Sequence, residues 1–302
     1  MPGLSEFVSF VAEKSGVKDT SLIELDIILH RILKEFCSSP TSTKYLFKGG
    51  SCLTKCYLGY YRFSVDLDFT WKNQETWTGL GEKELRRELL DEIKVLASFL
   101  EKVSEETGLR FKAEHKNRNF VEFGGGGRMV TFKLWKNSEL IKIQVNFIER
   151  LLFPPKKVTV KTLLDKAKLS RDEKAYFEEF LGFYRPLQIM AYDGREILCE
   201  KVRAILTRRV QKLRDFYDLF MLSKHGYKIE DLIKEIIEKT RASLYYKKYR
   251  SNLEENRKEL KMGEGLLEDP FERRLLIEIS QRDFEDFLKV IGSKLKEIAN
   301  SV

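Results

Sequence analysis

Two aspartates one residue apart carry the strongest chemical signal in the chain. Asp66 and Asp68 alternate with the apolar residues Val65, Leu67 and Phe69. This alternation is typical of a strand with one buried face, so both carboxylates are expected to point to the opposite face. At a rise of about 3.3 Å per residue they would lie roughly 6–7 Å apart along the backbone. Together they could hold one or two hard cations such as Mg²⁺, which prefers oxygen ligands and substrate phosphates.

A glycine turn precedes the aspartates. It reads K-G-G-S over Lys48, Gly49, Gly50 and Ser51, and fourteen residues separate Ser51 from Asp66. A strand over 45–48 would lead into the turn and a short helix would follow it. Backbone N–H groups at the start of a helix suit a phosphate, and glycine lets that phosphate approach closely. We therefore interpret the two motifs as a phosphate cradle and a metal platform; an edge strand with solvated aspartates is the alternative.

A second motif lies about 130 residues downstream. It comprises Glu200 and Lys201, then Arg208, then the run R-D-F-Y-D-L that begins at Arg214. Lys201, Arg208 and Asp215 are seven residues apart, which on one continuous helix places them within about 40° of one another. A stripe that faces a cleft and a surface ion-pair ladder both fit this spacing. A break in the helix near 211–213 would remove the stripe.

The two motifs, in this order, resemble those of the AbiEii/AbiGii toxin-type nucleotidyltransferases, a family that includes the MenT toxins of toxin–antitoxin systems. The family patterns are K-G-G-[ST] followed by R-x-S-x-D-[LI]-D, and E-K-x…R…R-D-x-x-D-L, and the matches span roughly residues 20–225. The resemblance implies an α+β fold of the DNA polymerase β-like type, with a mixed sheet, flanking helices and a following all-helical domain.

The resemblance also implies a reaction and its residues. It implies Mg²⁺-dependent transfer of NMP from an NTP to RNA, especially the 3′ end of tRNA, and a cognate antitoxin protein as partner. The implied metal ligands are Asp66 and Asp68, which with Lys201 and Asp215 form the catalytic set. Lys201 would contact phosphate, and Asp215 would act near the nucleotide or as a base. The implied nucleotide-binding positions are Lys48, Gly49, Gly50, Ser51, Arg62, Ser64, Arg208 and Arg214.

The chain departs from the pattern at the position of a third carboxylate. Enzymes of the polymerase β type usually carry it on a neighbouring strand, for which 140–147 is the candidate, but Gln144 or Asn146 would stand there. Glu149 has the wrong parity unless a bulge intervenes. Either the site uses two carboxylates or the third comes from elsewhere, for example Asp215.

The remaining patterns predict a two-domain organisation. Pro154-Pro155 marks a boundary between a nucleotidyltransferase domain over 1–153 and a helical domain over 154–302 that carries the second motif. Helical periodicity is expected over 4–36, where His30 is interpreted as a packing residue, and over 82–107. Four strand-like runs follow: 111–115, 120–123, 129–135 and 140–147. The glycines of 124–127 are expected at a hairpin tip. Beyond the boundary helices are expected at 159–168, 172–182, 195–224, 229–260 and 270–300.

Composition bears on partners and location. The 302 residues carry a formal net charge of +8, which suits an anionic partner such as nucleic acid and equally suits a well-solvated surface. The run Y-Y-K-K-Y-R at 245–250 is interpreted as an RNA-gripping segment or as a solvated helix face. No apolar run is long enough to span a bilayer and no signal segment is recognised, so we expect a cytoplasmic protein without a membrane partner.

Two other functions fit the same sequence. One keeps the chemistry but transfers the NMP group to a protein or a small molecule. The other is a non-catalytic nucleotide- or RNA-binding module, suggested by the missing third carboxylate. The sequence selects neither the NTP nor the oligomeric state.

Overall fold

The computed structural model describes residues 2–260, 268–277 and 281–302. The chain divides into two compact units. The sheet unit comprises Met1–Gly59, Phe63–Glu149 and Lys156–Ala191. The helical unit comprises Tyr60–Arg62, Arg150–Pro155 and Tyr192–Val302. This division does not coincide with the expected boundary after residue 153, because residues 156–191 return to the sheet unit.

The sheet unit is built on a seven-stranded sheet in the order β3-β4-β5-β2-β1-β7-β6. The strands are β1 (Tyr45–Lys48), β2 (Asp66–Trp71), β3 (Val121–Gly124), β4 (Met129–Lys136), β5 (Glu139–Asn146), β6 (Lys156–Val160) and β7 (Leu187–Ala191). The sheet is mixed, since β2 pairs with β5 and β1 with β7 in parallel while the other neighbours are antiparallel. The expected α+β fold with a mixed sheet is confirmed.

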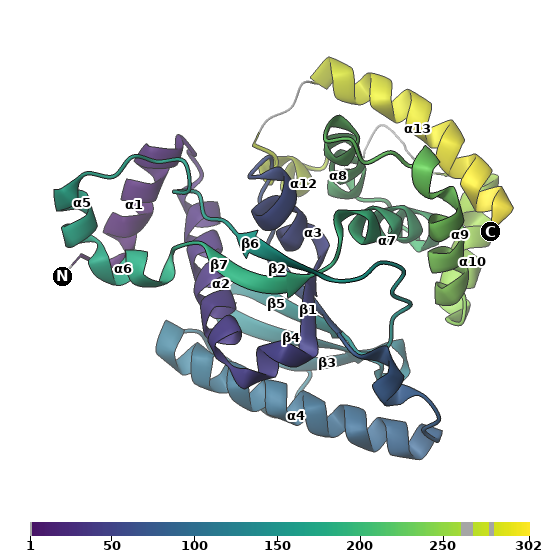
Figure 1. The fold of residues 1–302 in the computed structure, drawn as a ribbon, viewed down its shortest axis with the longest axis horizontal. Coiled ribbons are helices and arrows are strands. Elements are labelled where there is room, and N and C mark those ends of the chain that lie inside the picture. The colour runs from purple at the N-terminus through teal and green to yellow at the C-terminus, as the bar shows by residue number, and fades with distance from the viewer. Residues whose placement is uncertain (1, 261–267, 278–280) are drawn as a thin grey trace. The chain divides into compact units, whose positions relative to one another are not determined.

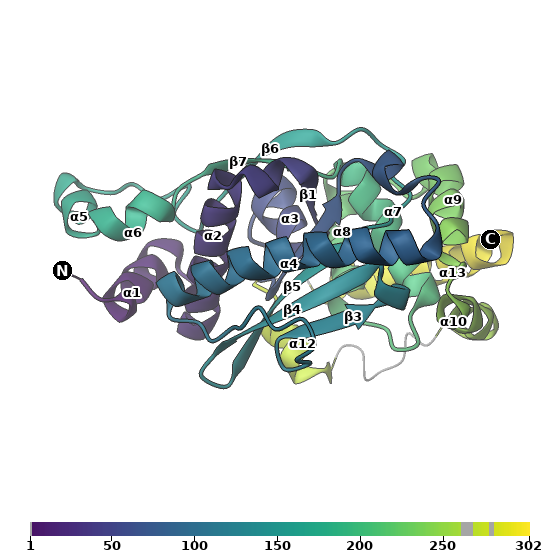
Figure 2. The ribbon, with the colours of Figure 1, turned by 90° about the horizontal axis from the view of Figure 1, so that it is seen from below.

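Helices α2 and α4 cover one face of the sheet (Figures 1 and 2). The helices of this unit are α1 (Leu4–Ser15), α2 (Thr20–Ser38), α3 (Gly49–Cys52), α4 (Glu82–Thr107), α5 (Arg171–Tyr176) and α6 (Glu178–Phe183). Short 3₁₀ turns are η1 (Pro40–Lys44), η3 (Gln74–Trp77) and η4 (Gly125–Gly127), and η2 (Leu53–Leu58) is a π-helix. Asp19 caps α2 by accepting from the Leu22 N–H, and Gly108 ends α4 in the left-handed region. The predicted helix over 82–107 is confirmed.

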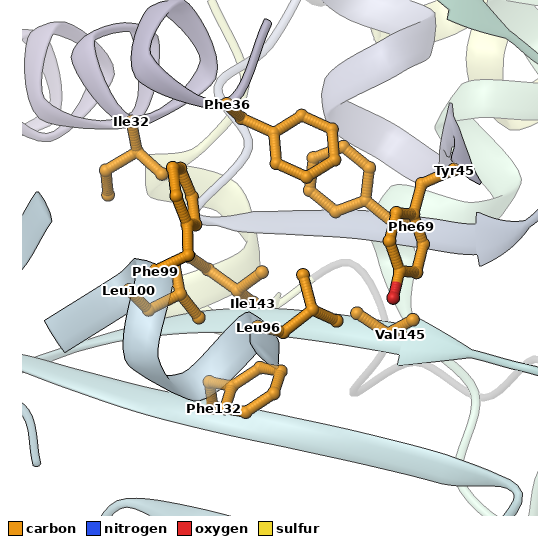
Figure 3. A pocket seen from close by; sticks show the side chains of 10 residues that line it. All are labelled: Ile32, Phe36, Tyr45, Phe69, Leu96, Phe99, Leu100, Phe132, Ile143 and Val145. Carbon is orange, nitrogen blue, oxygen red and sulfur yellow. The ribbon is translucent and has the colours of Figure 1, made fainter. Parts of the chain in front are cut away.

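The apolar core of the sheet unit lies between this face and the two helices. Leu67 and Phe69 point into it from β2, whereas Asp66 and Asp68 are half-buried on the other face, as the alternation predicted. A cavity of about 10 Å³ remains in this core (Figure 3). Of the ten side chains that line it, only Tyr45 carries a polar atom, and its hydroxyl is buried without a hydrogen-bond partner among the described residues.

Several expected elements are wrong. Residues 111–115 form no strand; there the chain makes a single bridge from Arg110 to Trp135. The expected helix over 159–168 is replaced by β6 and a turn, because the β-branched run pairs with β7. The helix expected over 4–36 is two helices, since Gly16 ends α1 with φ +73°. The four glycines do connect β3 to β4 at a hairpin tip, as expected.

The helical unit follows β7. Its described residues form the helices α7 (Gly194–Thr207), α8 (Leu213–Lys224), α9 (Ile233–Ser243), α10 (Lys247–Lys258), α12 (Pro270–Arg274) and α13 (Gln281–Ser301), with a 3₁₀ turn η5 (Glu230–Leu232). The pair of helices expected over 195–224 is confirmed as α7 and α8, with a break between Arg208 and Lys212. Residues 278–280 of the helix expected over 270–300 lie outside the described residues. Within the part of the chain that is described, no helix is both long enough and apolar enough to cross a membrane.

Candidate active site

The two aspartates of β2 stand between two polar neighbours in the sheet. Asp68 is in register with Lys48 of β1 and with Gln144 of β5, and Asp66 is in register with Lys142. Paired residues project from the same face of a sheet, so these side chains share the face opposite the apolar core. The prediction that the strand at 140–147 lies beside the aspartates is confirmed, and Gln144 occupies the position beside Asp68.

The K-G-G-S turn is held directly against β2. Gly49 has φ +75°, a conformation that favours glycine, and a Cβ atom there would lie 2.8 Å from Asp68 Cγ. Ser51 is fully buried, and its hydroxyl donates a hydrogen bond to the backbone carbonyl of Asp66. Because Gly49 has no Cβ atom, the Asp68 side chain can lie directly against the turn. The Ser51 hydroxyl ties the turn to the start of the strand.

A third acidic residue lies near this turn. The Glu149 carboxylate accepts from Asn146 Nδ2 at 2.8 Å and pairs with Lys48 Nζ at 3.4 Å. Its own N–H donates to Gln74 Oε1 at 2.8 Å. Because β5 ends at Asn146, strand parity does not govern the direction of Glu149. Among the described residues, however, no group of three or more His, Cys, Asp or Glu side chains is arranged to hold a metal.

Two further positions of the first motif precede β2. Ser64 is half-buried in the irregular segment before the strand. Arg62 belongs to the helical unit and is 1% exposed. Its guanidinium is bidentate on Asp218, with Nε 2.6 Å from Oδ1 and Nη2 2.8 Å from Oδ2. This environment favours a structural role for Arg62, because a nucleotide phosphate would have to displace Asp218.

The second motif comes together in the helical unit, although not as a stripe on one helix. Arg208 has extended backbone dihedrals and ends α7, and α8 begins at Leu213, so the chain breaks where a break was expected to remove the stripe. Lys201 Nζ of α7 nevertheless lies 2.9 Å from Asp215 Oδ1 of α8, and Arg208 pairs with Asp215 Oδ2. Packing of α7 on α8 therefore brings Lys201, Arg208 and Asp215 together, as a common face of one helix would have done.

Asp218 lies at the centre of this cluster. No role was predicted for Asp218 from the sequence. It is fully buried and accepts from Arg62, from Lys201 Nζ at 2.6 Å and from the Tyr61 hydroxyl at 2.7 Å. Burial alone would raise the pKa of Asp218, but Arg62 and Lys201 outweigh it and hold that pKa well below its usual range. Burial lowers the pKa of Lys201, and Asp218 opposes that change. The motif R-D-x-x-D-L contained the signal for Asp218.

Arg214 is engaged elsewhere in the same unit. Its backbone N–H donates to Glu272 Oε2 at 3.1 Å, and its guanidinium lies 3.4 Å from Glu272 Oε1. Both charges are largely buried. The described structure therefore gathers Lys201, Arg208 and Asp215 into one cluster and leaves Arg214 in a separate pair with α12.

Comparisons with known proteins agree with these motifs. The family model described as "Nucleotidyl transferase AbiEii toxin, Type IV TA system" matches residues 31–299. A search of curated proteins finds no match. Among solved structures the chain is similar to MenT4, a nucleotidyltransferase toxin from Mycobacterium tuberculosis H37Rv, with 17% identity and a TM-score of 0.50 over 94% of this chain and 98% of that chain. At this identity the likeness shows the fold alone. Since the family match includes both motifs and most of the sequence, the chain belongs to the AbiEii family of nucleotidyltransferase toxins of type IV toxin–antitoxin systems.

Proposed function

We propose that this toxin transfers an NMP group from an NTP to RNA, with the 3′ end of tRNA as the acceptor. In this reaction a hydroxyl oxygen of the acceptor forms a bond to the α-phosphorus, the bond to the β-phosphate breaks, and pyrophosphate leaves. The observation that carries the proposal is the placement of Asp66 and Asp68 on one face of β2, with the Gly49 turn held against Asp68.

The donor set on β2 fits Mg²⁺. Asp66 and Asp68 offer carboxylate oxygens at half-buried positions on one face of β2. Two protein carboxylates suffice for Mg²⁺, which keeps several waters and shares substrate phosphates. When bound, the ion would neutralise charge on the phosphates and polarise the reacting oxygens.

Other motif residues would bind or orient the nucleotide. Backbone N–H groups of Gly49 and Gly50 would donate to the phosphates, while Ser51 fixes the turn to β2. In the helical unit Lys201 would contact phosphate, and Asp215 would act near the nucleotide or as the base that takes the hydroxyl proton. Arg208 would hold Asp215 in place, as their ion pair supports.

Support for an RNA acceptor comes from the start of α10. Lys247, Lys248 and Arg250 are exposed there beside a row of tyrosines. The Tyr246 ring lies 5.6 Å from that of Tyr245 and 5.5 Å from that of Tyr249. Exposed cations attract the phosphate backbone, and aromatic rings stack on unpaired bases.

The decisive experiment is a transfer assay with each labelled NTP, Mg²⁺ and total tRNA. We expect label to be transferred to tRNA with at least one NTP, and we expect EDTA to abolish this transfer. The transfer rate should fall by about 100-fold or more for Asp66→Asn or Asp68→Asn. Asp91→Asn is the matched control, because Asp91 is an exposed residue of α4 that pairs locally with Lys94. Absence of transfer with every NTP, or transfer by Asp68→Asn equal to wild type, would contradict the proposal.

Two further results, one from the transfer assay and one from calorimetry, would identify the other functions. Labelled product that survives ribonuclease would indicate a protein or small-molecule acceptor. NTP binding in a calorimeter without pyrophosphate release under any divalent metal would indicate a non-catalytic binding module. The second outcome has a specific motivation, since among the described residues no group of three or more His, Cys, Asp or Glu side chains is arranged to hold a metal.

Family membership also supports a protein partner. We propose a cognate antitoxin that relieves growth inhibition, and action in the cytoplasm, where NTPs and tRNA are available. Expression of the toxin alone should arrest growth, and Asp68→Asn should not. Growth unaffected by active toxin would argue against this role.

A further inference from the structure

A buried charged cluster lies in the sheet unit outside the residues considered so far. Its centre is the ion pair between Lys55 Nζ of η2 and Asp26 Oδ1 of α2, which are 2.6 Å apart. The two side chains are 2% and 3% exposed. The Tyr184 hydroxyl, itself buried, donates to Asp26 Oδ2 at 2.7 Å. None of these residues has a role in the proposed reaction.

Lys55 belongs to the segment that begins with the phosphate-binding turn. We call Gly49–Leu58 the arm; it consists of the α-helical turn α3 and the π-helix η2. The near end of the arm is fixed to β2 through Ser51 and Gly49. π-Helical segments are uncommon and occur frequently at functional sites, because they insert an extra residue into the helical register.

The far end of the arm is fixed by Lys55. In addition to the ion pair, the backbone carbonyl of Lys55 accepts the N–H of Lys161 at 2.9 Å. The His30 ring, one turn after Asp26 on α2, is fully buried and donates Nε2 to the carbonyl of Arg185 at 2.7 Å. Burial lowers the pKa of His30 to about 3, so the ring is neutral and adds no second positive charge beside Lys55.

A buried ion pair is poorly explained by stability alone. Removing two charges from water is unfavourable, and well-packed apolar residues in their place are often as stable or more stable. The pair does, however, discriminate between conformations. If the arm changed its helical register, the Lys55 ammonium would leave Asp26 and both charges would be buried without each other. The pair therefore selects one register of the arm, one turn after Ser51.

We propose that Asp26 and Lys55 are positioning residues that fix the register of the arm and thereby place the Gly49–Ser51 turn for NTP binding. This inference rests on the proposed function in one respect, the identity of the ligand at the turn. It assigns Asp26 and Lys55 no contact with substrate.

The test uses a near-isosteric neutral pair, Asp26→Asn with Lys55→Met, in the full-length protein. The introduced asparagine would keep an acceptor for the Tyr184 hydroxyl, and the double substitution leaves no lone buried charge. We expect backbone amides of residues 49–58 to exchange with deuterium at least about tenfold faster, while those of α4 are unchanged. We also expect the KM for NTP to rise about tenfold with kcat within about threefold of wild type.

Two control variants separate positioning from general destabilisation. Lys239→Met breaks an equally buried pair in the helical unit, where Lys239 Nζ lies 2.6 Å from Glu196 Oε1. It should leave exchange at residues 49–58 and the KM unchanged. Tyr184→Phe keeps the Asp26–Lys55 pair and removes one donor, so it should also leave both readouts within about twofold of wild type. We expect this variant to fold with the pair intact.

The outcomes are distinguishable. Unchanged exchange at residues 49–58 in the double variant overturns the inference, as does faster exchange there with an unchanged KM. If the double variant fails to fold, Asp26→Glu takes its place, because it keeps both charges and lengthens the side chain so that the pair must shift: faster exchange at 49–58 with α4 unchanged would support the inference, and exchange equal to wild type would overturn it. If the wild-type protein neither binds nor uses any NTP, the proposed function fails, and the exchange measurement still decides whether the pair fixes the arm.

Discussion

Gly49 lies directly against the side chain of Asp68. A Cβ atom on Gly49 would lie 2.8 Å from Asp68 Cγ and 2.9 Å from Asp68 Cβ, and the φ of +75° independently favours glycine. The turn that would bind the phosphates and the strand that would bind the metal are therefore packed without space for a side chain between them. This contact gives the K-G-G-S motif a physical requirement for glycine at its second position.

Replacing Gly49 by alanine should abolish transfer and weaken the fold. The new methyl group would displace Asp68 and strain the backbone, lowering the free energy of unfolding by about 2–3 kcal/mol. Urea denaturation and the transfer assay measure the two effects. Gly108→Ala is the control, because Gly108 has φ +68° with nothing within 4 Å of its Cβ position. The free energy of unfolding of this control should fall by about 1 kcal/mol, and its transfer activity should be retained. Full activity of Gly49→Ala would show that Asp68 need not stay where it is.

Replacing Asp218 by asparagine should destabilise the helical unit. Arg62 and Lys201 would remain buried without their shared carboxylate, which costs about 3–5 kcal/mol. Asp193→Asn is a matched control: this buried carboxylate pairs with the half-exposed Arg195 and caps α7. Asparagine caps a helix N-terminus as well as aspartate does, so the free energy of unfolding of the control should fall by less than about 1 kcal/mol. Equal losses in chemical denaturation would contradict the central role of Asp218.

His30 should make stability depend on pH below neutrality. Its folded pKa of about 3 lies below the ordinary value of 6.5, so only the unfolded state gains a proton as the pH falls between them. The contribution of neutral His30 to the free energy of unfolding is therefore complete above pH 6.5 and is lost as the pH falls below that value. Between pH 7.5 and 5 we expect a loss of about 2 kcal/mol, measured by urea denaturation at each pH. His30→Gln should flatten this difference, whereas His225→Gln, at an exposed position, should keep it.

Replacing Tyr45 by phenylalanine should stabilise the sheet unit. The Tyr45 hydroxyl is buried at the small apolar cavity without a partner among the described residues (Figure 3). Its removal should raise the free energy of unfolding by about 1 kcal/mol. Tyr184→Phe, which removes a hydroxyl bonded to Asp26, should lower it by about 1–2 kcal/mol. A loss of stability in Tyr45→Phe would indicate that the hydroxyl is satisfied in solution.

Charge reversal on α10 should weaken RNA use selectively. Exchanging Lys247, Lys248 and Arg250 for glutamate should raise the KM for tRNA by about tenfold or more and reduce its salt dependence, with the KM for NTP unchanged. The control reverses three exposed cations of α4, namely Arg86, Arg87 and Lys94. If both triple variants behave alike, the effect comes from net charge and the α10 surface is not the RNA site.

Local features of the candidate active site could be predicted from sequence because they depend on neighbours in the chain. The alternation around Asp66 and Asp68 predicted a strand with one buried face. The glycine turn and the strand over 45–48 were recognised from composition. The helix over 82–107 was predicted with the correct ends, since Gly81 and Gly108 flank it. Such patterns report which side of an element meets the core.

Tertiary packing decided the rest. β6 and β7 joined the sheet because partners far along the chain supplied their hydrogen bonds, which periodicity cannot report. Lys201 met Asp215 through the packing of α7 on α8 despite a broken helix. Arg62 forms an ion pair with Asp218, which lies 156 residues away in the chain, and Lys55 forms an ion pair with Asp26. The sequence by itself determined the family, the reaction class and the carboxylate strand; the fold decided which charges pair, because pairing depends on distances between elements rather than on the order of residues within them.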